Sequence, residues 1–249
     1  MSNSPLVSYT KISPNKTSPR NHKIDTITIH CVVGQCSLET LGSIFSSPST
    51  QASCNYGISY DGKVGMYVEE KDRSWCSSSR ENDNRAITIE VASDTSHPYT
   101  VRKAAYDTLI DLLVDICKRN NIPKLLWKAD KNLIGQVDKQ NMTVHRWFAN
   151  KDCPGEYLYS RHSEIAKLVN QRLVGKNDNS TVKSDTYTVR VIAKDLNIRQ
   201  GPGTNYPSNG YITPGTYTIV QESSGQGSSA WGKLKSGAGW ISLDYCSKI

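Results

Sequence analysis

Apolar and polar residues alternate along two short segments, 23–30 and 85–90. Side chains of a β-strand point alternately to its two faces, so each segment predicts a strand with one apolar face. The apolar positions are Ile27, Ile29, Ile87 and Ile89. The opposite face ends in His30 in the first segment and in Glu90 in the second. Two predicted strands therefore each end in a polar side chain that is capable of chemistry.

A repeat of three to four residues predicts amphipathic helices in three further segments, 38–45, 102–120 and 165–173. Their apolar positions are Leu38, Leu41, Ile44, Phe45, Ala105, Leu109, Leu112, Leu113, Ile116, Cys117, Ile165, Leu168, Val169 and Leu173. Ser37 stands where an N-cap of the first helix is expected. Helices that alternate with strands predict the α/β class, with a mixed central sheet flanked by helices.

The pattern changes in the last third of the chain. Residues 175–185 form a polar run without an apolar period, which predicts a linker. Only short strand-like runs with Gly and Pro between them follow, at 187–192, 196–199, 216–220 and 239–243. We therefore predict a main domain at residues 1–174 and a small all-β barrel at residues 186–249.

Composition and charge exclude several classes of function. The formal net charge of +7 is spread over the chain, with 22 basic and 18 acidic residues in 1–175 and 8 and 5 in 176–249. Because no part carries a concentrated basic stripe, we expect no nucleic-acid partner. No apolar run is long enough for a membrane helix, and the first residues lack the basic and apolar regions of a signal peptide. We therefore expect no membrane partner and synthesis in the cytoplasm.

Seven cysteines are present, an odd number without closely spaced pairs. This count argues against a secreted disulfide scaffold, so we expect most of them to be reduced. Cys31 and Cys36 are interpreted as small buried residues, Cys31 on the strand face opposite to His30.

Three residues, His30, His145 and Cys153, together offer the ligand set of a catalytic zinc ion. Such an ion takes three ligands from His, Cys and carboxylate and leaves one position open. Cys153 precedes Pro154, which favours an extended conformation in a loop. By spacing alone, each histidine is more often a hydrogen-bonded structural residue than a ligand. A zinc ribbon is disfavoured because it needs two Cys-x-x-Cys pairs, and the sequence has none.

The run Val144–Gly155, with the sequence VHRWFANKDCPG, resembles the signature of N-acetylmuramoyl-L-alanine amidases of the phage-lysozyme and peptidoglycan-recognition type. The segments Asn55–Gly62 and Ala86–Glu90 are similar to further parts of that family, and the resemblance covers roughly residues 20–173. It implies that zinc is bound by the three residues named above. It also implies that Lys151 assists catalysis, whereas without the resemblance Lys151 is an ordinary solvated loop lysine.

Amide hydrolysis at a zinc site needs a group that moves protons and a cation beside the developing oxyanion. Glu90 is the candidate for the first task, with a solvated surface glutamate as the alternative, and Lys151 is the candidate for the second. Several relatives carry a catalytic tyrosine at the position of Cys54. Either Glu90 takes the role of that tyrosine, or Tyr56 reaches the site from a shifted strand register. Asn55 and Tyr56 are also our candidates for substrate contacts, and the alternative for Tyr56 is a packed core aromatic.

The run Asn197–Tyr206 resembles bacterial SH3-like domains, as do Trp231–Leu234 and Gly239–Ile241. The resemblance implies a module that binds the cell wall and raises the local concentration of substrate. Tyr206 and Tyr211 are candidates for wall contacts, whereas Trp231 and Trp240 are expected to fill the core.

These features together predict hydrolysis of the amide bond between N-acetylmuramic acid and L-alanine in bacterial peptidoglycan. The alternatives are a zinc endopeptidase that cuts the stem peptide or cross-bridge, and a peptidoglycan-binding protein without activity. The presence of Cys153 favours an enzyme. A wall-binding module without a signal peptide suggests a phage or prophage endolysin that acts on the wall after its release from the cytoplasm, and the sequence gives no indication of oligomeric state.

Overall fold

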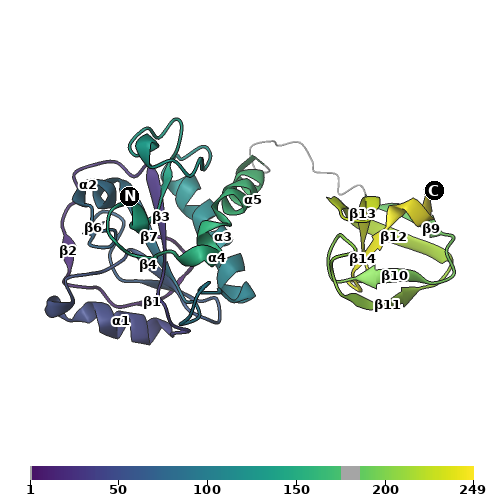
Figure 1. The fold of residues 1–249 in the computed structure, drawn as a ribbon, viewed down its shortest axis with the longest axis horizontal. Helices are drawn as coiled ribbons and strands as arrows, with labels where there is room; N and C mark the ends of the chain where they lie inside the picture. The colour runs from purple at the N-terminus through teal and green to yellow at the C-terminus, as the bar shows by residue number, and fades with distance from the viewer. Residues whose placement is uncertain (1, 175–185) are drawn as a thin grey trace. The chain divides into compact units, whose positions relative to one another are not determined.

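A computed structural model of the chain describes residues 2–174 and 186–249. The predicted linker, 175–185, lies outside the described residues. The chain divides into two compact units, 1–178 and 179–249, and each is described here by itself (Figure 1).

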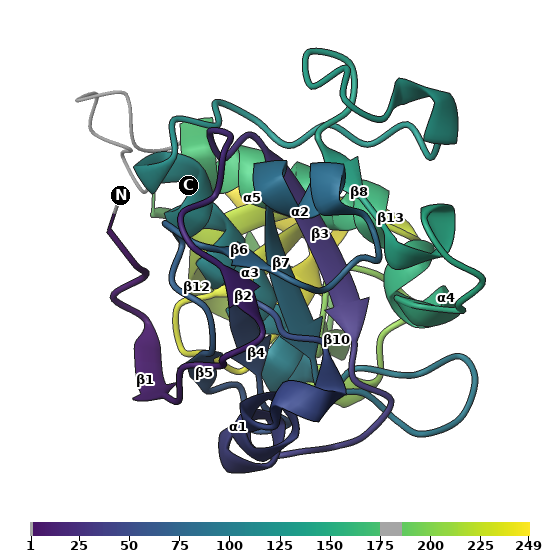
Figure 2. The same cartoon turned by 90° about the vertical axis from the view of Figure 1, so that its left-hand side faces the viewer.

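The first unit is built on a six-stranded mixed sheet with the order β1-β5-β4-β7-β3-β8. The strands in chain order are β1 Val7–Thr10, β3 Thr26–Cys31, β4 Tyr56–Ile58, β5 Val64–Met66, β7 Ala86–Val91 and β8 Met142–Thr143. Strands β4, β7, β3 and β8 run parallel to one another, and β5 pairs antiparallel with β4. The two predicted strands, β3 and β7, lie side by side at the centre of the sheet (Figure 2). The predicted mixed sheet is confirmed.

Two long helices cover the isoleucine face of this sheet, as the apolar pattern predicts. Helix α3 spans Lys103–Arg119 and helix α5 spans His162–Val174. Their buried side chains form one core with the apolar residues of β3 and β7. Members of this core include Ile27, Ile29, Ile87, Ile89, Leu109, Leu112, Leu113, Ile116, Ile165 and Val169.

Helix α1, Leu38–Ser46, packs on the opposite face of the sheet. Ser37 caps it, since its side chain accepts a hydrogen bond from the Thr40 N–H. Leu41 approaches strand β4 so closely that a Cβ at Gly57 would lie 2.8 Å from its side chain. A larger residue at this position would force the side chains of Leu41 and Tyr67 to shift. The helices thus flank both faces, as the α/β prediction requires.

Shorter elements complete the first unit. They are β2 Lys16–Thr17 and β6 Arg73–Ser74, which pair with each other, α2 Arg80–Arg85, α4 Gly155–Tyr159, and the 3-10 turns η1 Pro48–Thr50, η2 Lys131–Leu133 and η3 His145–Trp147. Among the described residues, no helix combines the length and apolar character that crossing a bilayer requires.

The second unit is all-β, as predicted, with seven strands in the order β11-β10-β14-β13-β12-β9-β15. The strands are β9 Tyr187–Val191, β10 Leu196–Arg199, β11 Ser208–Ile212, β12 Gly215–Gly225, β13 Ser228–Leu234, β14 Trp240–Ser242 and β15 Cys246–Lys248, with a 3-10 turn η4 Leu243–Tyr245. All neighbouring pairs are antiparallel. The core contains Val189, Val191, Leu196, Ile212, Ile219, Leu234 and Ile241. Trp231 is buried as expected, whereas Trp240 is only partly buried.

Candidate metal centre

Parallel pairing of β3 and β7 places two predicted site residues side by side. His30 is the register partner of Glu90 at the carboxyl ends of the two strands. Both lie on the face opposite to the isoleucine core, since the side chains of a strand alternate. Deeper on this face, Thr28 and Thr143 share a hydrogen bond of 2.8 Å, and Asn82 donates to Thr28 at 2.9 Å. This network fixes β3 against β8 beneath the site.

The structure brings the three predicted zinc ligands together. One donor atom from each of His30, His145 and Cys153 lies within 4.8 Å of the other two. The Cys153 Sγ is 3.3 Å from His30 Nδ1. The two imidazole rings meet edge to face, with centroids 5.1 Å apart. Two nitrogens and a sulfur at these distances fit the donor set of a catalytic zinc ion.

His145 and Cys153 belong to one loop, 144–155, which Arg146 holds in shape. The Arg146 N–H donates to the Cys153 carbonyl at 3.1 Å. Its guanidinium donates to the Asp152 carbonyl at 2.8 Å and carboxylate at 3.0 Å, and lies over the ring of Tyr159. The neighbouring Trp147 stacks on Trp127, with centroids 5.0 Å apart. The loop therefore presents two of its side chains to the end of β3 in a fixed arrangement.

Burial keeps both imidazoles neutral at ordinary pH. His30 is fully buried, and this burial, together with the nearby His145, lowers the pKa of His30 to about 3. Partial burial and the charge of Lys151 lower the pKa of His145 as well. Neutral imidazole is the form that binds metals. His145 Nε2 is 3.0 Å from the Ser78 hydroxyl, which leaves Nδ1 as the free donor atom of this ring.

The Cys153 thiol has a neighbouring sulfur, that of Cys31. The contact with Cys31, together with burial, raises the pKa of Cys153. Uptake of a metal by this cysteine would therefore release a proton. The prediction for Cys31 is confirmed, since it is buried and belongs to the isoleucine core on the face opposite to His30. Because loop 144–155 crosses the end of β3, this last residue of the strand also contacts the site.

Glu90 lies beside the three donors and is not a solvated surface residue. Only 17% of its side chain is exposed, and its Oε1 is 4.0 Å from His30 Nδ1. Burial raises the pKa of Glu90 to about 7, and a hydrogen bond from the Cys76 thiol opposes that shift. A carboxyl group with this pKa exchanges protons readily near neutral pH.

Lys151 is exposed in loop 144–155, within electrostatic range of His145. Among the contacts of the described residues, its ammonium group forms no ion pair.

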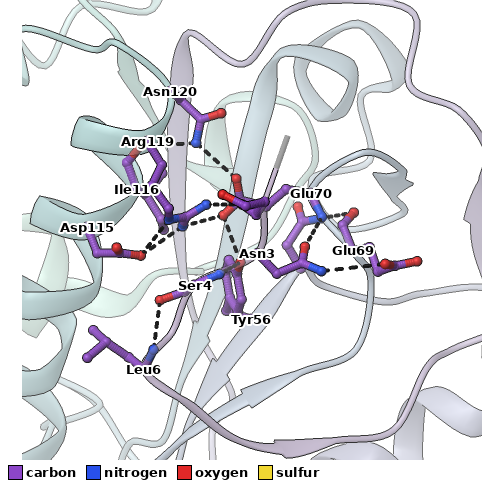
Figure 3. Close-up of polar contacts among 12 residues, drawn as sticks. Asn3, Ser4, Leu6, Tyr56, Glu69, Glu70, Asp115, Ile116, Arg119 and Asn120 are labelled. Carbon is purple, nitrogen blue, oxygen red and sulfur yellow. Dashed lines mark hydrogen bonds and ion pairs between the residues drawn. The ribbon is translucent and has the colours of Figure 1, made fainter.

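The predicted substrate contacts of Asn55 and Tyr56 gain no support from the structure, because neither side chain is exposed. Both are fully buried. The Asn55 amide donates to the Val68 carbonyl and accepts from the Thr88 N–H, each at 3.2 Å. The Tyr56 hydroxyl donates to Glu70 at 2.7 Å in the network of Figure 3. The alternative interpretation of Tyr56 as a packed core aromatic is confirmed.

Sequence reasoning did not single out Cys76 and Ser78, which both contact the centre. They lie in the loop between β6 and α2, where no apolar period exists. Ser78 has a φ of 62°, which is uncommon for a residue other than glycine. The run Cys76–Ser79 is the only signal in the sequence, and without the fold it has no specific meaning.

Comparison with known families decides the affiliation of the chain. Residues 20–156, more than half of the chain, match the family model described as N-acetylmuramoyl-L-alanine amidase. The chain belongs to this family. Within this family match lie all five predicted metal-binding and catalytic residues, namely His30, Glu90, His145, Lys151 and Cys153.

Several solved structures of amidases and endolysins are similar to this chain. The catalytic domain of XlyA is 14% identical, covers 65% of this chain and 97% of its own, and has a TM-score of 0.48. A mutant endolysin from Bacillus subtilis is 15% identical, with coverages of 65% and 97% and a TM-score of 0.48. The N-acetylmuramoyl-L-alanine amidase LysC from Clostridium intestinale URNW is 18% identical, with coverages of 66% and 95% and a TM-score of 0.46. No curated protein matches the chain.

Proposed function

We propose that this chain is a zinc-dependent amidase that hydrolyses the bond between N-acetylmuramic acid and L-alanine in bacterial peptidoglycan. The observation that carries the proposal is the convergence of His30, His145 and Cys153 beside Glu90. It occurs in a chain of the N-acetylmuramoyl-L-alanine amidase family. A non-catalytic binding protein would not need this set of donors.

The three donors suit zinc because both imidazoles are neutral and the thiol is a soft ligand. Bound there, zinc would supply Lewis acidity, which polarises the amide carbonyl and acidifies the attacking water. Loop 144–155 and strand β3 hold the donors in place through the contacts of Arg146 and the register of β3 with β7.

Glu90 takes a proton from the attacking water and returns one to the departing amine of L-alanine. Support for this role comes from its position 4.0 Å from His30 and from its pKa of about 7. Lys151 stabilises the negative charge that develops on the carbonyl oxygen. Removal of such a donor costs about 3 kcal/mol of transition-state stabilisation in comparable sites.

The second unit, in this proposal, is an SH3-like module that binds the cell wall. Its all-β sheet and the resemblance of Asn197–Tyr206 to bacterial SH3-like domains support this role. We further propose that the whole chain is a phage or prophage endolysin. It would be made in the cytoplasm and would act on the wall after release.

Digestion of purified sacculi with and without a chelator tests the proposal. We expect new L-alanine amino groups, and we expect the chelator to abolish them and added zinc to restore them. New reducing sugars would identify a glycosidase instead. New amino groups elsewhere in the peptide would identify the endopeptidase. Binding to sacculi without any new terminus would identify a non-catalytic protein.

A further inference from the structure

His30 has a second pair of neighbours that can bind a metal, besides His145 and Cys153. These are Cys76 and Glu90, and one donor atom from each of the three residues lies within 4.8 Å of the other two. The Cys76 Sγ is 3.9 Å from Glu90 Oε1, and His30 Nδ1 is 4.0 Å from the same oxygen. Ligand atoms of a tetrahedral zinc ion lie about 3.5 Å apart, as bonds of about 2.0–2.3 Å require. Only a small contraction therefore separates this trio from metal-binding geometry.

The backbone around Cys76 is fixed independently of the first donor set. The buried carboxylate of Asp83 accepts hydrogen bonds from the Cys76 N–H at 2.9 Å and from the Ser77 N–H at 3.1 Å. These contacts anchor the loop at the residue whose sulfur faces Glu90. The thiol is thus positioned before any ion binds.

One carboxylate oxygen of Glu90 accepts no hydrogen bond from the described residues. This oxygen, Oε2, is buried. A buried carboxylate oxygen without a donor is unfavourable, and a bound cation would satisfy it. This oxygen belongs to the carboxylate whose Oε1 is 3.9 Å from Cys76 Sγ, so it is a second indication, besides the donor spacing, that this carboxylate binds a cation.

The two donor sets share one nitrogen atom. His30 Nδ1 is 3.3 Å from Cys153 Sγ and 4.0 Å from Glu90 Oε1, so it faces both sets. Because one ring nitrogen coordinates one ion, the two sets are alternatives. We propose that Cys76, Glu90 and His30 form a second position for a thiophilic divalent cation, in which the ion is retained but hydrolysis stops.

The loss of activity follows from the use of Glu90 as a ligand, since a coordinated carboxylate no longer moves protons between water and the leaving amine. The inhibitory meaning of the second position rests on the proposed function. The existence of the second position does not rest on the proposed function. Spectroscopy of the bound metal tests its existence without an activity assay.

Cobalt(II) distinguishes the ligand sets because it replaces zinc and gives a charge-transfer absorption band when a thiolate is bound. We expect the full-length Cys153→Ser variant to bind one cobalt ion per chain and to retain a thiolate band, now supplied by Cys76. Adding Cys76→Ser should remove the band and weaken binding of cobalt and zinc by roughly tenfold or more, because a soft ligand is lost. Cys246→Ser, in the second unit, is the matched control and should change neither property.

Complete loss of the band in Cys153→Ser alone would overturn the proposal. Two double variants, Cys153→Ser with Cys76→Ser and Cys153→Ser with Cys31→Ser, identify the sulfur that gives the band. A band that remains in the first and disappears in the second would also overturn the proposal. Circular dichroism shows whether the Cys76 variant folds. If it does not, the double variant Cys153→Ser with Glu90→Gln replaces it. A metal affinity equal to that of Cys153→Ser alone would then contradict the proposal. A wild-type chain that binds metal but releases no L-alanine termini would refute the proposed function and leave the metal result intact.

Discussion

Burial sets the protonation of the two residues at the strand ends, and it acts on them in opposite senses. It lowers the pKa of His30 to about 3 and raises that of Glu90 to about 7. The cause is the same, because a buried site disfavours the charged form of either group. His30 is therefore a neutral donor for a metal, and Glu90 exchanges protons near neutral pH. One environment prepares the two residues for different tasks.

Replacement of Glu90 with glutamine should change how the stability of the metal-free protein depends on pH. The folded-state pKa of about 7 lies above the ordinary value of 4.5. The unfolded chain therefore ionises first, and the wild type loses stability relative to Glu90→Gln as pH rises from about 4.5 to 7. A fully shielded group would contribute about 1.36 kcal/mol for each unit by which its pKa is shifted. We expect a smaller total loss, about 1–2 kcal/mol, because solvent reaches 17% of the Glu90 side chain.

Denaturant unfolding of both proteins in the presence of a chelator measures this difference. The shifted pKa of His30 affects both proteins alike and cancels in the comparison. Parallel stability profiles of the two proteins between pH 4.5 and 8 would show that Glu90 is not held in a charge-excluding environment.

At the scale of elements, loop 144–155 between β8 and α4 delivers two of the three donors. Strand β3 supplies the third from the centre of the sheet, where its hydrogen bonds to β7 and β8 fix it. The loop has no such ladder and relies on Arg146, which bonds to the Cys153 and Asp152 backbone and packs on Tyr159. The geometry of the loop thus depends in part on a side chain that is not itself a donor.

Arg146→Ala should weaken zinc binding by about tenfold to a hundredfold, the usual effect of removing a residue that orients metal ligands. The hydrogen bond from the backbone N–H of residue 146 to the Cys153 carbonyl persists in this variant. We therefore expect loop 144–155 to become more mobile but to keep its conformation. Competition with a chromogenic chelator measures the affinity. Arg161→Ala is the matched control, because Arg161 also lies over a tyrosine ring, that of Tyr157, but does not contact loop 144–155. Equal affinities of the two variants would remove Arg146 from this role.

At the scale of the whole molecule, the chain divides its proposed tasks between two units. The residues of the metal centre all lie in the first unit. The second unit contains a cavity of about 490 Å³ that Trp231, Tyr211 and Tyr245 help to line. Tyr211 is 68% exposed, so its ring contributes little to the core and is available to a ligand. This arrangement favours Tyr211 over the less exposed Tyr206 as a wall contact.

Tyr211→Ala in the full-length chain should weaken binding to sacculi by roughly tenfold, as expected for an aromatic anchor at a binding site. Cleavage of a soluble muropeptide should stay unchanged, because the substitution is remote in sequence and confined to the second unit. Co-sedimentation with sacculi and a soluble-substrate assay separate the two effects. The matched control is Ile192→Ala, another exposed apolar side chain of the same unit. Equal loss of wall binding in the control would contradict a specific role of Tyr211.

The sequence alone determined the two strands that carry His30 and Glu90, three of the helices, and the direction of their side chains. Alternation placed His30 and Glu90 on the polar face of two strands, and the helical period defined α1, α3 and α5 to within a few residues. These features are local, because the backbone geometry of a strand or helix fixes which neighbours share a face. The resemblance of the run Val144–Gly155 to a known signature then identified the remaining donors.

Only the tertiary structure decided which polar residues meet. By sequence, Asn55 is a candidate substrate contact, yet it is fully buried and its amide bonds to the backbone of Val68 and Thr88. Cys76 and Cys31 join the metal centre because two loops close over the end of β3. Such contacts join residues that are far apart along the chain. They depend on loop closure and strand register, which no local pattern of apolar and polar residues records.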